Sequence, residues 1–113
     1  RGSACASTDR ALTRVRQSRR ARADLVAIWR WIARDSEERA SAVIRRIEAR
    51  ATILARHPEA GRPRPDIAPD ARSLTVERWL IFYKLDRQGA EVVRIVDASR
   101  DLSSMEWPAR GDA

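Results

Sequence analysis

The side chains that could move protons near neutral pH are few in this sequence. Histidine is the residue most often used for that purpose, because its ordinary pKa lies near neutrality. The sequence contains one histidine, His57, directly before Pro58. A proline pushes the preceding residue out of the helical region, so we expect His57 at the end of a helix, facing the negative end of the helix dipole. This structural role is favoured over a catalytic one.

A second set of polar side chains could form a histidine-free catalytic cluster. Its members are Arg72, Tyr83, Lys84, Arg94 and Arg100. Tyr83 alternates with Ile81 and Leu85 on one face of an expected strand, which favours a core or rim position. A tyrosine acts as an acid near pH 7 only if a cluster of cations lowers its pKa. We therefore predict that no side chain of this chain is a catalytic acid or base.

Metal ligands are also sparse, and no membrane segment is evident. One cysteine, Cys5, and one histidine cannot supply a zinc site, and a single cysteine cannot form an intrachain disulfide. No apolar run reaches the length of a membrane span, and no apolar signal-peptide core is present near the N-terminus. We predict a soluble cytoplasmic protein with no metal, no cofactor and no membrane association.

The charge is distributed unevenly along the 113 residues. Residues 1–57 carry fourteen Arg against six Asp and Glu, a net charge of +8, whereas residues 58–113 have a net charge of −1. A GC-rich coding bias would explain the preference for Arg over Lys but not this asymmetry. A basic half indicates an anionic partner, either a nucleic acid or an acidic protein segment.

Two helices are predicted in the first half, after a short strand at 12–17. Ser18 is a plausible N-cap, and apolar residues recur at helical spacing from Ala21 to Ile32. Ser36 caps a second helix that has acidic residues in its first turn and an apolar stripe from Ala40 to Leu54. Two helices separated by two or three residues form an antiparallel hairpin.

The second half changes to the period of β-strands after a proline-rich loop at 58–70. Strands are expected at 73–76, 79–85 and 91–96, with a hairpin turn at 86–89 that ends in Gly89. The predicted class is α+β, in the order β-α-α-β-β-β. We expect an antiparallel sheet of three to four strands packed against the helical hairpin. Residues 1–11 are interpreted as a disordered leader or a remnant of cloning, and residues 108–113 as a disordered tail.

Four tryptophans could pack in the core or present an exposed surface. Trp29 and Trp79 are expected in the core, because one lies on the apolar face of the first helix and the other opens a strand rich in apolar residues. Trp31 is expected at the boundary. Trp107, in the C-terminal tail, is expected to be the most exposed, and an exposed aromatic side chain favours contact with a partner protein.

The order and spacing of several short motifs resemble the ParE branch of the ParE/RelE toxins. The first half contains Ser18-x-x-Ala21-x-x-Asp24-Leu25 and Leu54-x-x-x-Pro58-x-x-Gly61-x-x-Arg64. The second half contains Arg72-Ser73-Leu74-x-Val76, Ile81-x-Tyr83, Val93-Arg94-Ile95-Val96 and Ser99-Arg100-Asp101. The resemblance runs from residue 12 to about residue 102, and a toxin domain is predicted over residues 12–107.

This resemblance implies the toxin of a type II toxin–antitoxin system. Its antitoxin would be ParD-like, with an acidic segment that wraps the toxin in a hetero-oligomer. ParE-type toxins poison DNA gyrase, whereas RelE-type toxins cleave mRNA on the ribosome. Many relatives have a histidine where this chain has Asp97. An ionised Asp cannot donate a proton and would repel a phosphate, so gyrase inhibition by binding is favoured.

Two alternatives remain open at this point: a ribosome-dependent endoribonuclease of the RelE type, and a degenerate, non-toxic homologue that only binds a partner. The toxin alone is not expected to bind specific DNA directly. Arg100 and Asp101 could form a local ion pair or belong to the toxic surface. The residues predicted to contact partners are Trp31, Arg62, Arg64, Arg72, Arg94, Arg100 and Trp107.

Overall fold

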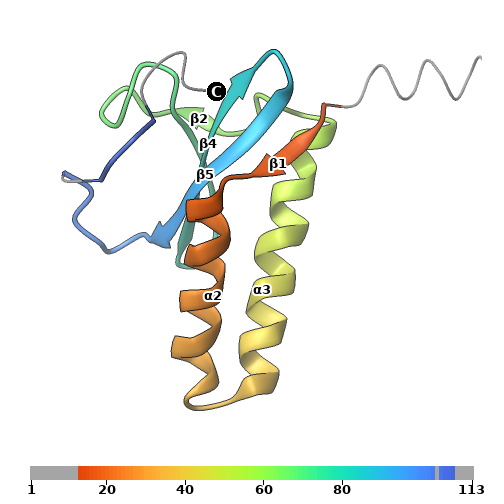
Figure 1. The fold of residues 1–113 in the computed structure, drawn as a ribbon, viewed down its shortest axis with the longest axis vertical. Helices are drawn as coiled ribbons and strands as arrows, with labels where there is room; N and C mark the ends of the chain where they lie inside the picture. Colours follow the sequence, from red (N-terminus) through yellow and green to blue (C-terminus); the bar gives the residue numbers. More distant parts are fainter. Residues whose placement is uncertain (1–12, 104, 109–113) are drawn as a thin grey trace, which may run out of the picture.

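Two antiparallel helices form the elongated lower part of the molecule (Figure 1). The computed structural model describes residues 13–103 and 105–108. Helix α2 spans Arg19–Ala33 and helix α3 spans Glu37–Thr52. A short 3₁₀ turn, η1 at Ile53–Ala55, ends the second helix before His57. The predicted leader at 1–11 and all of the predicted tail except Pro108 lie outside the described residues.

Serine side chains start both helices, as predicted. The Ser18 hydroxyl accepts a hydrogen bond from the backbone N–H of Ala21 at 2.9 Å. The Ser36 hydroxyl accepts one from the N–H of Arg39 at 3.1 Å. Each bond satisfies one of the amide groups that the first turn of a helix leaves free. The two caps thus fix where the helical hairpin begins and where it reverses.

The strands form one five-stranded sheet in the order β1-β5-β4-β3-β2. Strand β1 pairs with β5 in parallel, and the other neighbours are antiparallel. The strand bounds are Val15–Gln17 for β1, Arg62–Pro63 for β2, Arg72–Val76 for β3, Trp79–Asp86 for β4 and Gly89–Asp97 for β5. The α+β class and the β-α-α-β-β-β order are confirmed.

The observed sheet differs from the expected antiparallel sheet of three to four strands in two respects. The sheet has a fifth strand, β2, which lies within the segment interpreted as a loop. Its Pro63 has no N–H to donate, so the strand is confined to the sheet edge and its composition resembles that of a loop. The helical hairpin returns the chain to the end of the sheet at which β1 begins, where the N–H of Thr13 donates to the carbonyl oxygen of Ala55. Strands β3, β4 and β5 then alternate in direction, and β5 runs parallel to β1.

Gly89 makes the tight β4–β5 hairpin, as the sequence predicts. Its φ is +119°, a conformation that side-chain-bearing residues rarely adopt. A Cβ at this position would also lie 2.3 Å from the carbonyl oxygen of Arg14. Glycine is therefore required both by the turn and by the close approach of the chain that leads into β1.

The core lies between the helical hairpin and one face of the sheet. Ile47 of α3 is 1% exposed and packs with Leu25 and Ile28 of α2. The strands add Leu74, Ile81, Tyr83, Val92 and Ile95. Burial of these side chains supplies most of the free energy that holds the two layers together.

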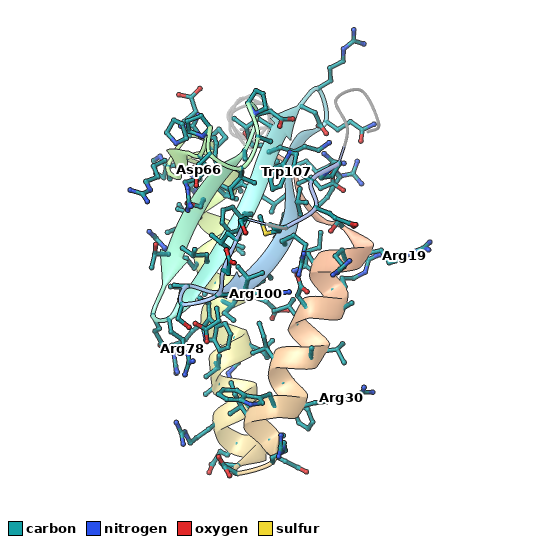
Figure 2. All side chains as sticks on the ribbon, turned by 90° about the vertical axis from the view of Figure 1, so that its left-hand side faces the viewer. Arg19, Arg30, Asp66, Arg78, Arg100 and Trp107 are labelled. Atoms are coloured by element: carbon teal, nitrogen blue, oxygen red, sulfur yellow. The ribbon has the colours of Figure 1, made fainter. Side chains whose placement is uncertain are left out.

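The opposite face of the sheet is also covered. Side chains alternate along β4, so Phe82 and Lys84 point away from the helices, and both are buried. The segment that follows β5 passes over this face and brings Trp107 against it (Figure 2). In the part of the chain that the structure describes, no helix is long and apolar enough to cross a membrane.

The buried position of Ile47 gives a stability prediction. Ile47→Asp should unfold the domain, because an unpaired carboxylate in the core costs several kcal/mol against a total stability of about 5–15 kcal/mol. Arg45→Asp, on the exposed side of the same helix, should leave the fold intact. Far-UV circular dichroism and urea unfolding of both variants test this. Equal tolerance of the two changes would contradict the assigned face of α3.

Candidate partner-binding surface

Asp24 of α2 and Arg94 of β5 form an ion pair that is largely shielded from solvent. The Nε of Arg94 lies 2.8 Å from Oδ2 of Asp24, and its Nη2 lies 3.3 Å from Oδ1. The same carboxylate accepts the backbone N–H of Ile95 at 2.9 Å. The exposed fractions of the two side chains are 6% for Arg94 and 13% for Asp24. Arg94 was predicted from the sequence to contact a partner. In the structure its guanidinium instead joins β5 to α2 through Asp24.

Tyr83 was expected in a core or rim position, and the structure places it in the core, fully buried. Its hydroxyl donates to the carbonyl oxygen of Pro58 at 2.8 Å and accepts from the N–H of Gly61 at 2.9 Å. A Cβ at residue 61 would lie 2.6 Å from the tyrosine ring, so only glycine fits there. The tyrosine therefore anchors the loop after α3.

Three further arginines predicted as partner contacts lie at the β2–β3 end of the sheet. Arg72 donates to the carbonyl oxygens of Gly61 and Glu59 at 3.0 and 3.2 Å. Arg64 pairs with Asp66 at 2.9 Å, and its guanidinium lies 5.2 Å from the centre of the Phe82 ring. Arg62 is exposed on the edge strand β2. Arg72 and Arg64 stabilise the loop and the outer face, and Arg62 projects into solvent.

Trp107 was expected to be the most exposed tryptophan, and this prediction is wrong. Its indole Nε1 donates to Asp70 at 2.9 Å, and its ring packs edge-on against Phe82 with the ring centres 6.4 Å apart. The side chain is half-buried. The described residues after β5 pack over the sheet. The position of Trp107 in the sequence gave no indication of these contacts.

The exposed tryptophan is instead Trp31, whose exposed fraction is 53%. The guanidinium of Arg78 lies 5.4 Å from the ring centre of Trp31 and 5.4 Å from that of Trp79. Trp79 is buried, as predicted. Such cation–π contacts hold an exposed indole in one orientation. Sequence reasoning missed Arg78, because only the fold brings the β3–β4 turn beside the end of α2.

Asp97 orients Arg78 from the other side. Its carboxylate accepts from Nε of Arg78 at 2.9 Å, and also from the N–H and hydroxyl of Ser99 at 2.9 and 2.8 Å. The hydrogen bond from the backbone N–H of Ser99, together with the Ser99 hydroxyl and Arg78, lowers the pKa of Asp97 below its ordinary value. Asp97 is therefore an anion at neutral pH.

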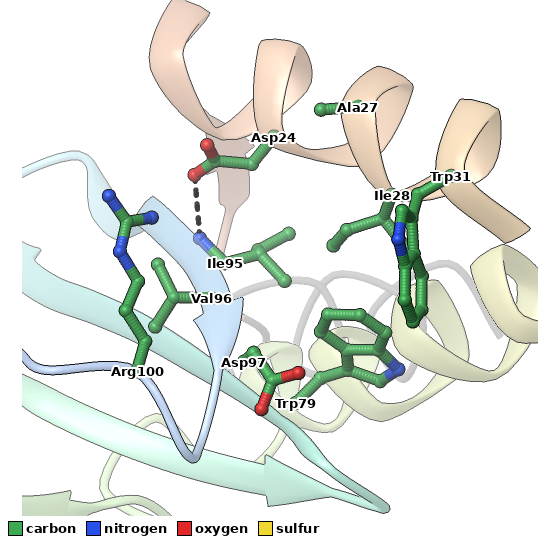
Figure 3. Close-up of a pocket in the computed structure, with 9 residues that line it drawn as sticks. All are labelled: Asp24, Ala27, Ile28, Trp31, Trp79, Ile95, Val96, Asp97 and Arg100. Atoms are coloured by element: carbon green, nitrogen blue, oxygen red, sulfur yellow. Dashed lines mark hydrogen bonds between the residues drawn. The ribbon is translucent and has the colours of Figure 1, made fainter.

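A hollow of about 250 Å³ opens between α2 and the ends of β4 and β5 (Figure 3). Trp31 and Trp79 stand on one side of it, and Arg100 lies on the other. The remaining lining residues are Asp24, Ala27, Ile28, Ile95, Val96 and Asp97. Among the predicted contact residues, the fold brings only Trp31 and Arg100 together here. Asp101 accepts the N–H of Ser103, and the described residues show no Arg100–Asp101 ion pair.

Over the residues that the structure describes, the fold consists of two helices packed on a five-stranded sheet, and Arg64, Lys84 and Arg94 on the outer face of that sheet form ion pairs within the fold. The family model described as "ParE toxin of type II toxin-antitoxin system, parDE" matches residues 15–102. The chain therefore belongs to the ParE toxin family, which confirms the resemblance seen in the sequence.

One curated protein and one solved structure resemble the chain. The chain is 30% identical over 92 residues to Toxin ParE3 of Caulobacter vibrioides, covering 80% of this chain and 92% of the relative. A solved structure of the chromosomal ParDE toxin–antitoxin system from P. aeruginosa superposes with a TM-score of 0.69 at 23% identity. That match covers 79% of this chain and 99% of the other and supports the shared fold.

Removal of the Asp24 carboxylate should destabilise the protein strongly. Asp24→Ala leaves a buried guanidinium and the N–H of Ile95 without their partner, a loss of about 3–5 kcal/mol. Arg46→Ala, which breaks the exposed pair with Glu77, should cost no more than about 1 kcal/mol. Urea unfolding measures both. Equal losses in the two variants would show that the Asp24–Arg94 pair is no stronger than a surface contact.

Asp97 should contribute stability that depends on pH. Because its pKa is lower in the folded protein than the ordinary value of 3.8, the contribution is present above that value and is lost as the pH falls through the folded pKa. Asp97→Ala should therefore be less stable than the parent chain at pH 7. The difference should shrink on acidification in thermal unfolding followed from pH 7 to pH 2. A difference that stays constant over this range would contradict the assignment.

Proposed function

We propose that this chain is the toxin of a type II toxin–antitoxin system, that an acidic ParD-like antitoxin neutralises it, and that it inhibits DNA gyrase by binding. Membership of the ParE family supports the first part. The solved structure with the similar fold is that of a ParDE toxin–antitoxin system, and this supports a ParD-like partner. The ParE-type toxins that the sequence resembles act on gyrase, and this supports the target.

The observation that favours binding over catalysis is the engagement of the candidate acid–base groups. A general acid must reach the leaving oxygen of its substrate at hydrogen-bond distance. The Tyr83 hydroxyl is buried, and both its donor and its acceptor capacity are used by the loop at 58–61. Arg94 is held by Asp24, and Asp97 is an anion held by Arg78 and Ser99.

Lys84 follows the same pattern. It is 5% exposed, and its Nζ lies 3.9 Å from Oε1 of Glu91 on the neighbouring strand. Three members of the histidine-free cluster considered from the sequence, Tyr83, Lys84 and Arg94, could act on a substrate only if they first left their contacts within the fold. Arg100 is exposed and remains available to a partner.

The charge distribution supports an acidic antagonist. The basic half of the sequence has a net charge of +8 and contains both helices. On α2, Arg19, Arg22 and Arg30 are exposed, whereas the one acidic side chain of that helix, Asp24, is turned toward Arg94. A surface of this kind attracts an acidic segment and speeds its association.

Purified chain should inhibit DNA supercoiling by gyrase and leave mRNA intact. The proposal predicts that relaxed plasmid stays relaxed in the presence of gyrase, ATP and the chain. In a parallel in vitro translation reaction, primer extension should show no new 5′ ends on the message. Tyr83→Phe, verified as folded by circular dichroism, should behave like the parent chain in both assays.

Two results would contradict the proposal. Gyrase activity unaffected by saturating amounts of folded chain would rule out the gyrase target. Codon-specific cuts that disappear in Tyr83→Phe would identify an endoribonuclease of the RelE type and would overturn the assignment of a binding-only mechanism.

A further inference from the structure

The hollow beside Trp31 is lined mainly by apolar side chains, and the two carboxylates that line it are already paired with arginines of the fold. Ala27, Ile28, Ile95 and Val96 contribute aliphatic surface, together with the indoles of Trp31 and Trp79. The two carboxylates that reach it, Asp24 and Asp97, already accept hydrogen bonds from arginines and from backbone N–H groups. The hollow therefore suits an uncharged side chain better than a cation.

Arg100, at the rim of the hollow, forms none of the ion pairs found between the described residues. Its side chain is exposed. It lies across the hollow from Trp31 (Figure 3). A ligand that fills the hollow with an apolar group can place a carboxylate beside Arg100, where a bidentate hydrogen-bonded pair can form.

Trp31 is positioned for contact before any partner arrives. Its ring is held against Arg78, and Arg78 is in turn held by Trp79 and Asp97. An exposed aromatic side chain that is already ordered loses little conformational entropy on binding, which makes it a favourable anchor at an interface.

We infer that this hollow receives one large apolar side chain from an acidic helical segment, and that a carboxylate of the same segment pairs with Arg100. The segment belongs to the antitoxin, so the inference rests on the proposed function. On a helix, residues three or four positions apart share a face, so the anchor and the carboxylate would have that spacing. The inference assigns Trp31 as the anchoring residue on the toxin side.

Charge favours an acidic segment over a second copy of this chain. The net charge is +7, and the basic half of the sequence includes α2, so two copies facing each other here would bring like charges together. Base recognition by stacking would need a basic groove along the phosphate backbone, whereas the walls of this hollow are mainly apolar. The combination of an apolar hollow with one unpaired arginine at its rim is complementary to an acidic amphipathic helix.

The candidate antitoxin is the protein encoded by the neighbouring reading frame. It is purified and titrated into the full chain, and isothermal titration calorimetry measures the binding affinity. Trp31→Ala should weaken binding by at least about tenfold, the loss typical of a central anchor. Arg100→Glu should also weaken binding, because it places two anions together. Arg45→Glu makes the same charge change on the exposed face of α3 and should have a smaller effect than Arg100→Glu. Circular dichroism checks that all variants are folded.

The outcomes separate the inference from the function on which it rests. If the parent chain binds and both Trp31→Ala and Arg100→Glu bind as tightly, the inference is overturned and the proposed function stands. If the parent chain does not bind, both are overturned. Sedimentation that shows a dimer converted to a monomer by Trp31→Ala would assign the hollow to a second copy. Tenfold tighter binding after deletion of residues 109–113 would assign it to the chain's own end, and either result overturns the inference.

Discussion

The carboxylate of Asp24 is the contact on which the arrangement of the two layers depends. Strand β1 covers the edge of β5 only from Ala90 to Val92, so the edge beyond it would present an unpaired amide at Ile95. Asp24 accepts that N–H and neutralises the buried Arg94 with the same carboxylate. The contact fixes α2 along β5, and with it the position of the hollow. Loss of Asp24 would leave the buried guanidinium of Arg94 without a counter-charge, and this lowers the free energy of unfolding far more than the loss of an exposed ion pair.

This constraint divides the molecule into a closed side and an open side. On the closed side, Phe82, Lys84 and Arg94 lie beneath the described tail or within buried pairs, and Tyr83 is enclosed in the core. On the open side, Trp31 and Arg100 face solvent around an apolar hollow. A protein built in this way offers surface for recognition while it keeps its candidate acid–base groups engaged in the fold.

The sequence predicts what local patterns determine and misses what distant contacts determine. The serine caps, the helical hairpin and the Gly89 turn follow from short-range spacing and were correctly placed. Strand β2 was missed because Pro63 makes an edge strand resemble a loop. The burial of Arg94 was also missed, since its partner lies 70 positions away and alternation alone does not identify which face is covered. Likewise, no sequence spacing relates Arg78 to Trp31, so the exposed site could be predicted only in part.

The central claim is that Arg94 and Tyr83 are permanent parts of the fold, and hydrogen exchange of their side chains measured by NMR tests it most directly. The Arg94 Nε–H, bonded to Asp24, and the Tyr83 hydroxyl, bonded to Pro58, should exchange only when the whole domain unfolds. The Nε–H of the exposed Arg100 is the internal reference and should exchange rapidly. If the Arg94 and Tyr83 protons exchange as fast as that of Arg100, these groups are free to meet a substrate, and the account of a binding toxin is contradicted.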